Sequence, residues 1–169
     1  MVSTYEWIPA LNISVALNLD ALGVFVAVVA GTIGFLVVLY SVKYMEHAEE
    51  EGYSLARYYA VTLLFIGSMI GLALSDNIIM IYIFWELVGF CSYALIAYYY
   101  KDPKAVRAGT KAFVTTRIGD TGFLIAIVAL WLATGETSLS AMMSKAGSES
   151  LLIAVAGFGV LLGAIGKSA

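Results

Sequence analysis

The chain has 169 residues, of which 62% are hydrophobic and only 12% are charged, and its mean hydropathy is +0.92. This composition lies outside the range of soluble domains and predicts an integral membrane protein. The net charge of -3 and the pI near 5.0 provide no basic surface for a phosphate backbone, so nucleic acid is excluded as a partner. Cys91 is the only cysteine, which leaves neither a disulfide framework nor a Cys/His metal site.

Residues 1–20 precede the first long apolar run. They contain Tyr5, Trp7, Ile8 and Leu11, followed by alternating apolar residues. Because Trp and Tyr favour the headgroup level of a bilayer, this pattern predicts an interfacial, extracytoplasmic segment that lies on the membrane.

Five apolar stretches follow, each bounded by charged or turn residues, and they predict an all-α, polytopic transmembrane helix bundle over residues 21–169. The last stretch is still apolar at Ala169, so we expect the sequence to be a piece of a longer protein. The polar link 75–77 is short and predicts an antiparallel hairpin between the second and third helices. The stretches lie near residues 21–42, 56–74, 77–100, 112–134 and 150–169.

Basic residues gather on one side of this predicted bundle. The segments that follow the first and third spans share that side and carry six of them, whereas the other side has only Lys145. The positive-inside rule therefore places the loops 43–56 and 101–111 in the cytoplasm and the amino terminus of the chain outside. We expect a multi-pass protein of a prokaryotic plasma membrane. The six basic residues are Lys43, Arg57, Lys101, Lys104, Arg107 and Lys111.

Glu86 stands in the middle of an apolar run, about nine residues into the third span and so roughly 14 Å deep. An ionised side chain there costs on the order of 3 kcal/mol, so the group should face a partner or a hydrated cavity. The proton affinity of a buried carboxyl responds to hydration and to nearby charge, which makes Glu86 a candidate for proton translocation. The alternative is a protonated Glu that only hydrogen-bonds a neighbouring helix.

Three other charges lie in or near apolar runs. Lys167 follows an apolar stretch and either snorkels to the interface or is a buried functional lysine. If a buried Lys167 met Glu86, the protonation of the two groups would be coupled. Arg117 and Asp120 are three residues apart, so they share one helix face and can form an ion pair. That pair either satisfies a snorkelling arginine or has a functional role.

Gly159 and Gly163 form a small-xxx-small pair that would let a neighbouring helix approach closely.

Several runs of residues are familiar in combination. They are Ser75-Asp76-Asn77, the run from Trp85 to Tyr93, the run from Lys111 to Asp120 with its Arg-Ile-Gly-Asp, and Gly-Lys-Ser-Ala at residues 166–169. Together they resemble the L subunit (chain 5, an antiporter-like subunit) of proton-translocating NADH-quinone oxidoreductase, respiratory complex I. A close relative such as the L subunit of the reduced-F420 dehydrogenase would share them.

The resemblance implies roles for the charged residues. Glu86 and Lys167 match the family's proton-translocating glutamate and lysine, and Arg117 and Asp120 match polar residues that tune this region. Lys167 is then expected in the membrane interior, and a charge change elsewhere in the complex would alter its interaction with Glu86. Multisubunit cation/proton antiporters share the Trp-Glu region, whereas the Arg-x-Gly-Asp run favours the respiratory subunit.

The resemblance also implies a non-redox subunit of a translocase enzyme. With no Cys cluster, flavin or nucleotide motif, we expect no redox cofactor in this chain. Flavin, Fe-S clusters, quinone and the electron donor would belong to partner subunits. The expected partners are other membrane subunits, including neighbouring antiporter-like ones, the lipid bilayer, protons and water. The alternatives are a subunit of a multisubunit cation/proton antiporter, or a non-pumping structural membrane subunit whose polar residues only hold helices together.

Overall fold

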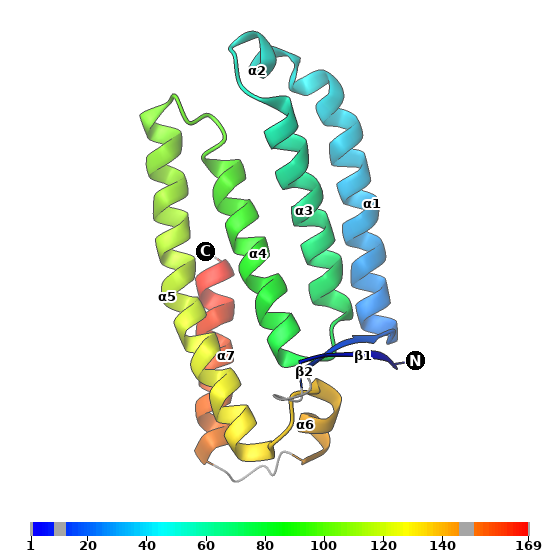
Figure 1. Cartoon of the computed structure of the whole chain (residues 1–169). Coiled ribbons are helices and arrows are strands. Elements are labelled where there is room, and N and C mark those ends of the chain that lie inside the picture. The colour runs from blue at the N-terminus through cyan, green and yellow to red at the C-terminus, as the bar shows by residue number, and fades with distance from the viewer. Residues whose placement is uncertain (1, 9–12, 146–150, 169) are drawn as a thin grey trace.

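The computed structural model describes residues 2–8, 13–145 and 151–168, which form mainly helices (Figure 1). Five of these helices, α1, α3, α4, α5 and α7, are long and apolar enough to cross a membrane, which confirms the predicted transmembrane bundle. The elements are β1 Val2–Ile8, β2 Ile13–Asn18, α1 Ala21–Tyr44, α2 Glu46–Glu50, α3 Leu55–Leu74, α4 Ile78–Ile96, α5 Pro103–Thr134, α6 Leu139–Lys145 and α7 Leu151–Ser168.

Polar side chains mark the start of four of the long helices. Asp20, Ser54, Asn77 and Asp102 each accept a hydrogen bond from a backbone N–H two or three residues further on, as N-cap residues do. The four helices then run alternately up and down beside one another, and α7 turns back along α5 (Figure 1). The three-residue link 75–77 joins α3 to α4 as the expected antiparallel hairpin.

The helix α5 begins earlier than the sequence pattern predicts. Asp102 caps the helix and Pro103 occupies its first turn, so most of the segment 101–111, predicted as a loop, is helical. The prediction was wrong because it placed the start of the helix where the apolar run starts, whereas the first turns of α5 carry charged residues and precede that run. The predicted loop 43–56 also contains a short helix, α2.

The amino-terminal segment forms an antiparallel β-hairpin, which hydropathy alone did not predict. Thr4 lies opposite Ala16 and Glu6 opposite Ser14. Tyr5 is 74% exposed and available to an interface, whereas Leu11 lies outside the described residues. The Ala16 carbonyl accepts a hydrogen bond from the backbone N–H of Asp76, which ties the hairpin to the α3–α4 link.

Glycines bring α5 and α7 into close contact. A Cβ added at Gly119 would lie 2.8 Å from the Cα of Gly166, and one added at Gly163 would lie 2.9 Å from the Cβ of Phe123. A Cβ at Gly159 would meet the backbone of α5 at Gly122. The predicted small-xxx-small pair is therefore confirmed as a helix-packing surface, and its partner is α5.

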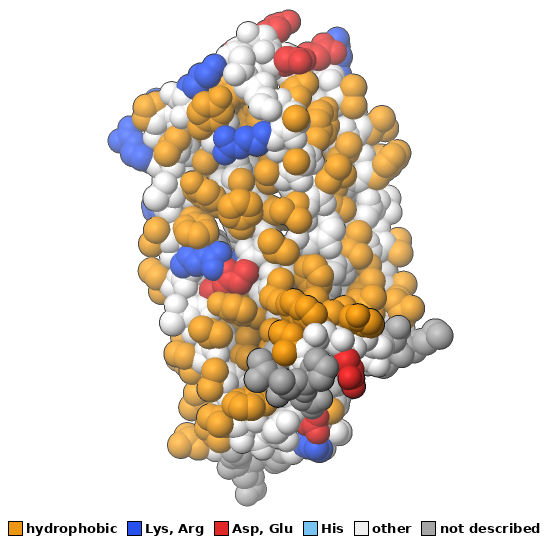
Figure 2. Space-filling view, in the orientation of Figure 1, with side chains coloured by type: hydrophobic (Ala, Val, Ile, Leu, Met, Phe, Trp, Pro, Cys, Tyr) orange, Lys and Arg blue, Asp and Glu red, His pale blue; other side chains and the backbone are white. Residues whose placement is uncertain are grey.

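On the face shown in Figure 2, an apolar belt lies between two ends that carry charged side chains. In this view one basic and one acidic patch also lie side by side within the belt, over α4 and α5. The helix α1 is apolar on all sides, and its buried residues are limited to Gly23, Gly34 and Ser41. Such a surface belongs in lipid or against further protein.

Candidate functional site

Glu86 lies on α4, next to the central residue of this 19-residue helix. Its carboxylate forms an ion pair with Arg117 of α5. The Arg117 side chain is 38% exposed and the Glu86 side chain 18%, and the guanidinium also stacks 4.7 Å from the ring centre of Phe113. A shallow hollow of about 440 Å³, which Tyr82 and Phe90 help to line, opens onto this pair. A charge pair at this depth is accessible from one side of α4 and α5.

A second charge pair lies between α5 and α7. Lys167 Nζ is 3.8 Å from Asp120 Oδ2, and the Asp120 side chain is only 2% exposed. Trp85 of α4 contacts both groups. Its indole N–H donates a hydrogen bond of 2.6 Å to Asp120 Oδ1, and its backbone carbonyl accepts one of 3.0 Å from Lys167 Nζ. The ammonium also lies 5.4 Å from the centre of the Trp85 ring, within cation–π range.

The structure thus brings the four predicted charged residues to one region but pairs them differently from the sequence-based expectation. Glu86 pairs with Arg117 rather than Lys167, and Asp120 pairs with Lys167 rather than Arg117. Arg117 and Asp120 do share one face of α5, as their spacing requires, yet one reaches α4 and the other α7. The last turn of α7, which carries Lys167, lies beside Gly119 near the middle of α5, and this position favours a buried lysine over one that snorkels to the membrane interface.

Sequence reasoning missed Trp85 as part of this site. The signal was available, because an indole N–H can only donate, and inside a membrane it needs an acceptor. Trp85 directly precedes Glu86, so α4 presents at successive positions a residue that contacts the Asp120–Lys167 pair and a member of the Glu86–Arg117 pair. The two pairs are therefore joined through α4 by this peptide bond and through α5 by a single helical turn.

The two pairs together carry no net charge when all four groups are ionised. Among the described residues, Arg117 is the cation that pairs with the largely buried Glu86 carboxylate. Adding or removing one proton leaves a net charge near the middle of the spans, where it is expensive. Such an arrangement couples the protonation of each group to the positions of the others.

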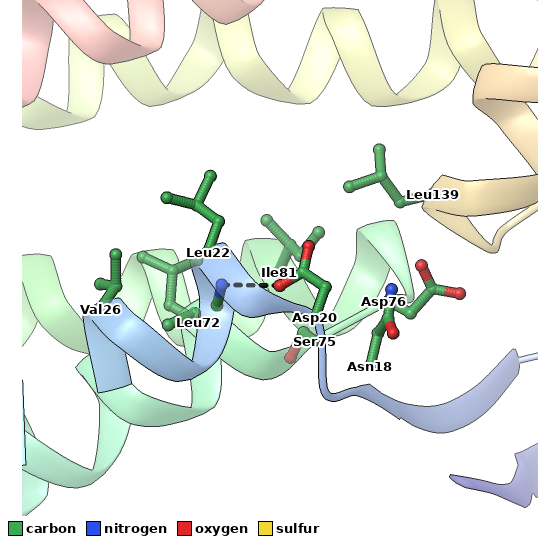
Figure 3. A pocket seen from close by; sticks show the side chains of 11 residues that line it. Asn18, Asp20, Leu22, Val26, Leu72, Ser75, Asp76, Ile81 and Leu139 are labelled. Carbon is green, nitrogen blue, oxygen red and sulfur yellow. Dashed lines mark hydrogen bonds between the residues drawn. The ribbon is translucent and has the colours of Figure 1, made fainter. Parts of the chain in front are cut away.

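A separate polar cluster lies at the end of the bundle that holds the hairpin and α6. Asp20 and Asp76 line a hollow of about 270 Å³ there, with Leu139 on its α6 side (Figure 3). Asp20 accepts a 2.6 Å hydrogen bond from the N–H of Gly23, and Asp76 accepts bonds of 2.6 to 2.8 Å from the hydroxyls of Ser138 and Ser140. Both carboxylates are thus engaged in holding backbone segments together.

Tyrosines form a further cluster at the opposite end, where the chain leaves α4. The ring of Tyr53 lies 5.1 to 5.8 Å from those of Tyr98, Tyr99 and Tyr100. Burial raises the pKa of Tyr98, and burial together with the charge of Glu51 raises the pKa of Tyr53. This cluster fastens the α1–α3 connection onto the end of α4.

Comparison with known proteins agrees with the fold and the motifs. Residues 75–169 match the family described as NADH:quinone oxidoreductase/Mrp antiporter, TM, and residues 7–59 match the family described as NADH-Ubiquinone oxidoreductase (complex I), chain 5 N-terminus. The chain is 38% identical over 173 residues to the chloroplastic NAD(P)H-quinone oxidoreductase subunit 5 of Zygnema circumcarinatum, and 39% identical over 175 residues to chain 5 from Picosynechococcus sp.. These alignments include 97% and 98% of this chain but only 24% and 26% of the relatives.

Solved structures show the same arrangement of helices. A chain of the Mrp complex from Dietzia sp. superposes with a TM-score of 0.88 at 29% identity, over 100% of this chain and 18% of that one. A chain of the membrane-bound sulfane sulfur reductase, an archaeal respiratory membrane complex, superposes with a TM-score of 0.76 at 23% identity over 95% of this chain and 31% of that one, which shows the fold. The predicted family is confirmed: the chain belongs to the NADH:quinone oxidoreductase/Mrp antiporter family of multi-pass membrane subunits.

Proposed function

We propose that this chain forms part of the proton path of an antiporter-like subunit in an NADH-quinone oxidoreductase-type complex. The observation that carries the proposal is the meeting of Glu86, Arg117, Asp120 and Lys167, from three helices, near the middle of the spans. Ionisable groups at that depth are expensive for a membrane protein and are a hallmark of ion pathways. The chain spans about a quarter of the length of the relatives it matches, so it holds one section of such a path.

The two ion pairs act as successive stations for a proton. When Glu86 takes up a proton, Arg117 loses its counter-charge and turns toward Asp120, one helical turn away on α5. Positive charge near Asp120 competes with Lys167 for that carboxylate and favours release of the lysine proton. These steps depend only on changes in charge near the four residues. Electron transfer in other subunits can therefore drive them without a redox group in this chain.

The remaining assignments follow from this proposal. Flavin, Fe-S clusters and quinone bind in partner subunits, and neighbouring antiporter-like subunits continue the path. The end of the bundle that carries α2 and most of the basic residues faces the cytoplasm of a prokaryote, which places the amino-terminal hairpin outside. Electrons come from NADH, reduced F420 or ferredoxin, according to the partner that supplies them.

The test is Glu86→Gln in the assembled complex. We expect proton pumping to fall by at least about a hundredfold, the lower end of the range for loss of a proton-transferring group, while electron transfer in uncoupled membranes continues. The matched control is Glu136→Gln, since Glu136 pairs with Lys145 in the connection beyond α5. Unchanged pumping by correctly assembled Glu86→Gln complex would contradict the proposal, and loss of assembly would favour a structural role for the pair.

A second candidate function is cation/proton antiport without electron transfer. It is favoured by the Dietzia Mrp complex, whose chain superposes along the whole of the present one. Sodium-dependent proton movement in vesicles that contain the complex, in the absence of any electron donor, would support antiport. Proton movement that requires a donor and a quinone would support the respiratory assignment.

A further inference from the structure

Gly89 lies one turn after Trp85 on α4 and, like the Trp85 carbonyl, faces Lys167 of α7. A Cβ built at Gly89 would collide with Lys167 Nζ and lie 3.8 Å from Lys167 Cε. The ammonium group therefore occupies the space that a side chain at position 89 would take. From there it donates its 3.0 Å hydrogen bond to the Trp85 carbonyl.

We propose that Gly89 is a positioning residue for Lys167, and that its missing side chain leaves a notch through which the ammonium reaches the Trp85 carbonyl beside Asp120. The inference rests on the proposed role of Lys167 in proton translocation. A backbone carbonyl accepts a hydrogen bond from an ammonium but takes no proton from it. The notch thus orients Nζ and leaves Asp120 as the ionisable partner.

A methyl group at position 89 would break this arrangement while leaving the helices in place. To restore ordinary contact with the added carbon, Nζ must move by roughly 1 Å. We expect this movement to weaken or break its 3.0 Å hydrogen bond to the Trp85 carbonyl. The atom that moves is the tip of a flexible side chain. By contrast, a Cβ at Gly119 would press on the backbone of α7. Gly89→Ala should therefore fold and assemble.

The matched control is Gly67→Ala on α3. A Cβ at Gly67 meets no atom within 4 Å, so this variant reports only the general effect of replacing a helical glycine in a membrane span. We expect Gly89→Ala to lower the proton-pumping rate about tenfold in the intact complex, in keeping with a lost hydrogen bond to a charged group, and Gly67→Ala to leave it unchanged.

A double-mutant cycle with Lys167→Ala separates positioning from a general packing defect. Gly89→Ala should lower the thermal midpoint of the complex when Lys167 is present. It should behave like Gly67→Ala in the Lys167→Ala background, where no ammonium fills the notch. Equal effects in both backgrounds, or wild-type pumping by Gly89→Ala, would overturn the inference and leave the proposed function intact. Wild-type pumping by Lys167→Ala would overturn both.

Discussion

Replacing Gly119 with Ala should separate α5 from α7 and, with them, Asp120 from Lys167. The new Cβ would lie 2.8 Å from Gly166 Cα and 2.9 Å from the Leu162 carbonyl oxygen, both of which are backbone atoms of α7. Reaching ordinary contact near 3.5 Å requires α7 to move by roughly 0.7 Å. Overpacking of this kind costs about 1–3 kcal/mol, against a gain of about 1 kcal/mol from the higher helix propensity of Ala.

The measurement is the thermal midpoint and the pumping rate of the intact complex, with Gly67→Ala as the reference. Relative to that variant, Gly119→Ala should be less stable by about 1–3 kcal/mol, because both gain the same propensity and only one meets backbone. The Lys167–Asp120 distance is already 3.8 Å, so its further increase should lower pumping as well. Equal midpoints for the two variants would refute the close-packing argument.

Three further predictions concern other parts of the chain. Asp76→Ala should destabilise the complex by about 1–3 kcal/mol in thermal unfolding, because the hydroxyls of Ser138 and Ser140 lose their charged acceptor; an unchanged midpoint would show that water replaces it. Trp85→Phe keeps an aromatic ring but removes the donor to Asp120, so pumping should fall while electron transfer persists; full pumping would contradict its role. Tyr53 and Tyr98 have raised pKa values, so the folded state holds their protons more tightly than the unfolded state does. The stability of the folded state should therefore fall only as the pH rises above about 10, and ultraviolet titration with parallel unfolding measurements will check this.

The membrane-spanning helices could be predicted from the sequence because length and hydropathy decide whether a segment crosses a bilayer. The cost of burying a carboxylate in an apolar run likewise singles out Glu86 from its sequence neighbours alone. These features depend on one segment at a time. The same argument singled out Lys167, Arg117 and Asp120 as charges in or near apolar runs, the family motifs implied their roles, and the structure places all three in one region with Glu86.

The pairing of these charges could not be predicted, since it depends on how each helix is rotated about its axis. Spacing showed that Arg117 and Asp120 share a face of α5, but not that α4 would meet one and α7 the other. The close approach of α7 is made by glycines, which carry no charge or hydropathy signal for the site they build. The hairpin was missed because its strands are short and precede a much stronger apolar pattern.

The division of charges between two pairs also bears on how the chain enters the membrane. Glu86 and Arg117 belong to consecutive spans, so they can neutralise each other as α4 and α5 leave the insertion machinery as a hairpin. Asp120 can first accept a hydrogen bond from the Trp85 indole, whereas its cation, Lys167, follows only after α6 and α7 have been synthesised. We therefore expect α5 to be neutralised in two stages during insertion, the second when the glycine surface of α7 packs against α5 and brings Lys167 to Asp120.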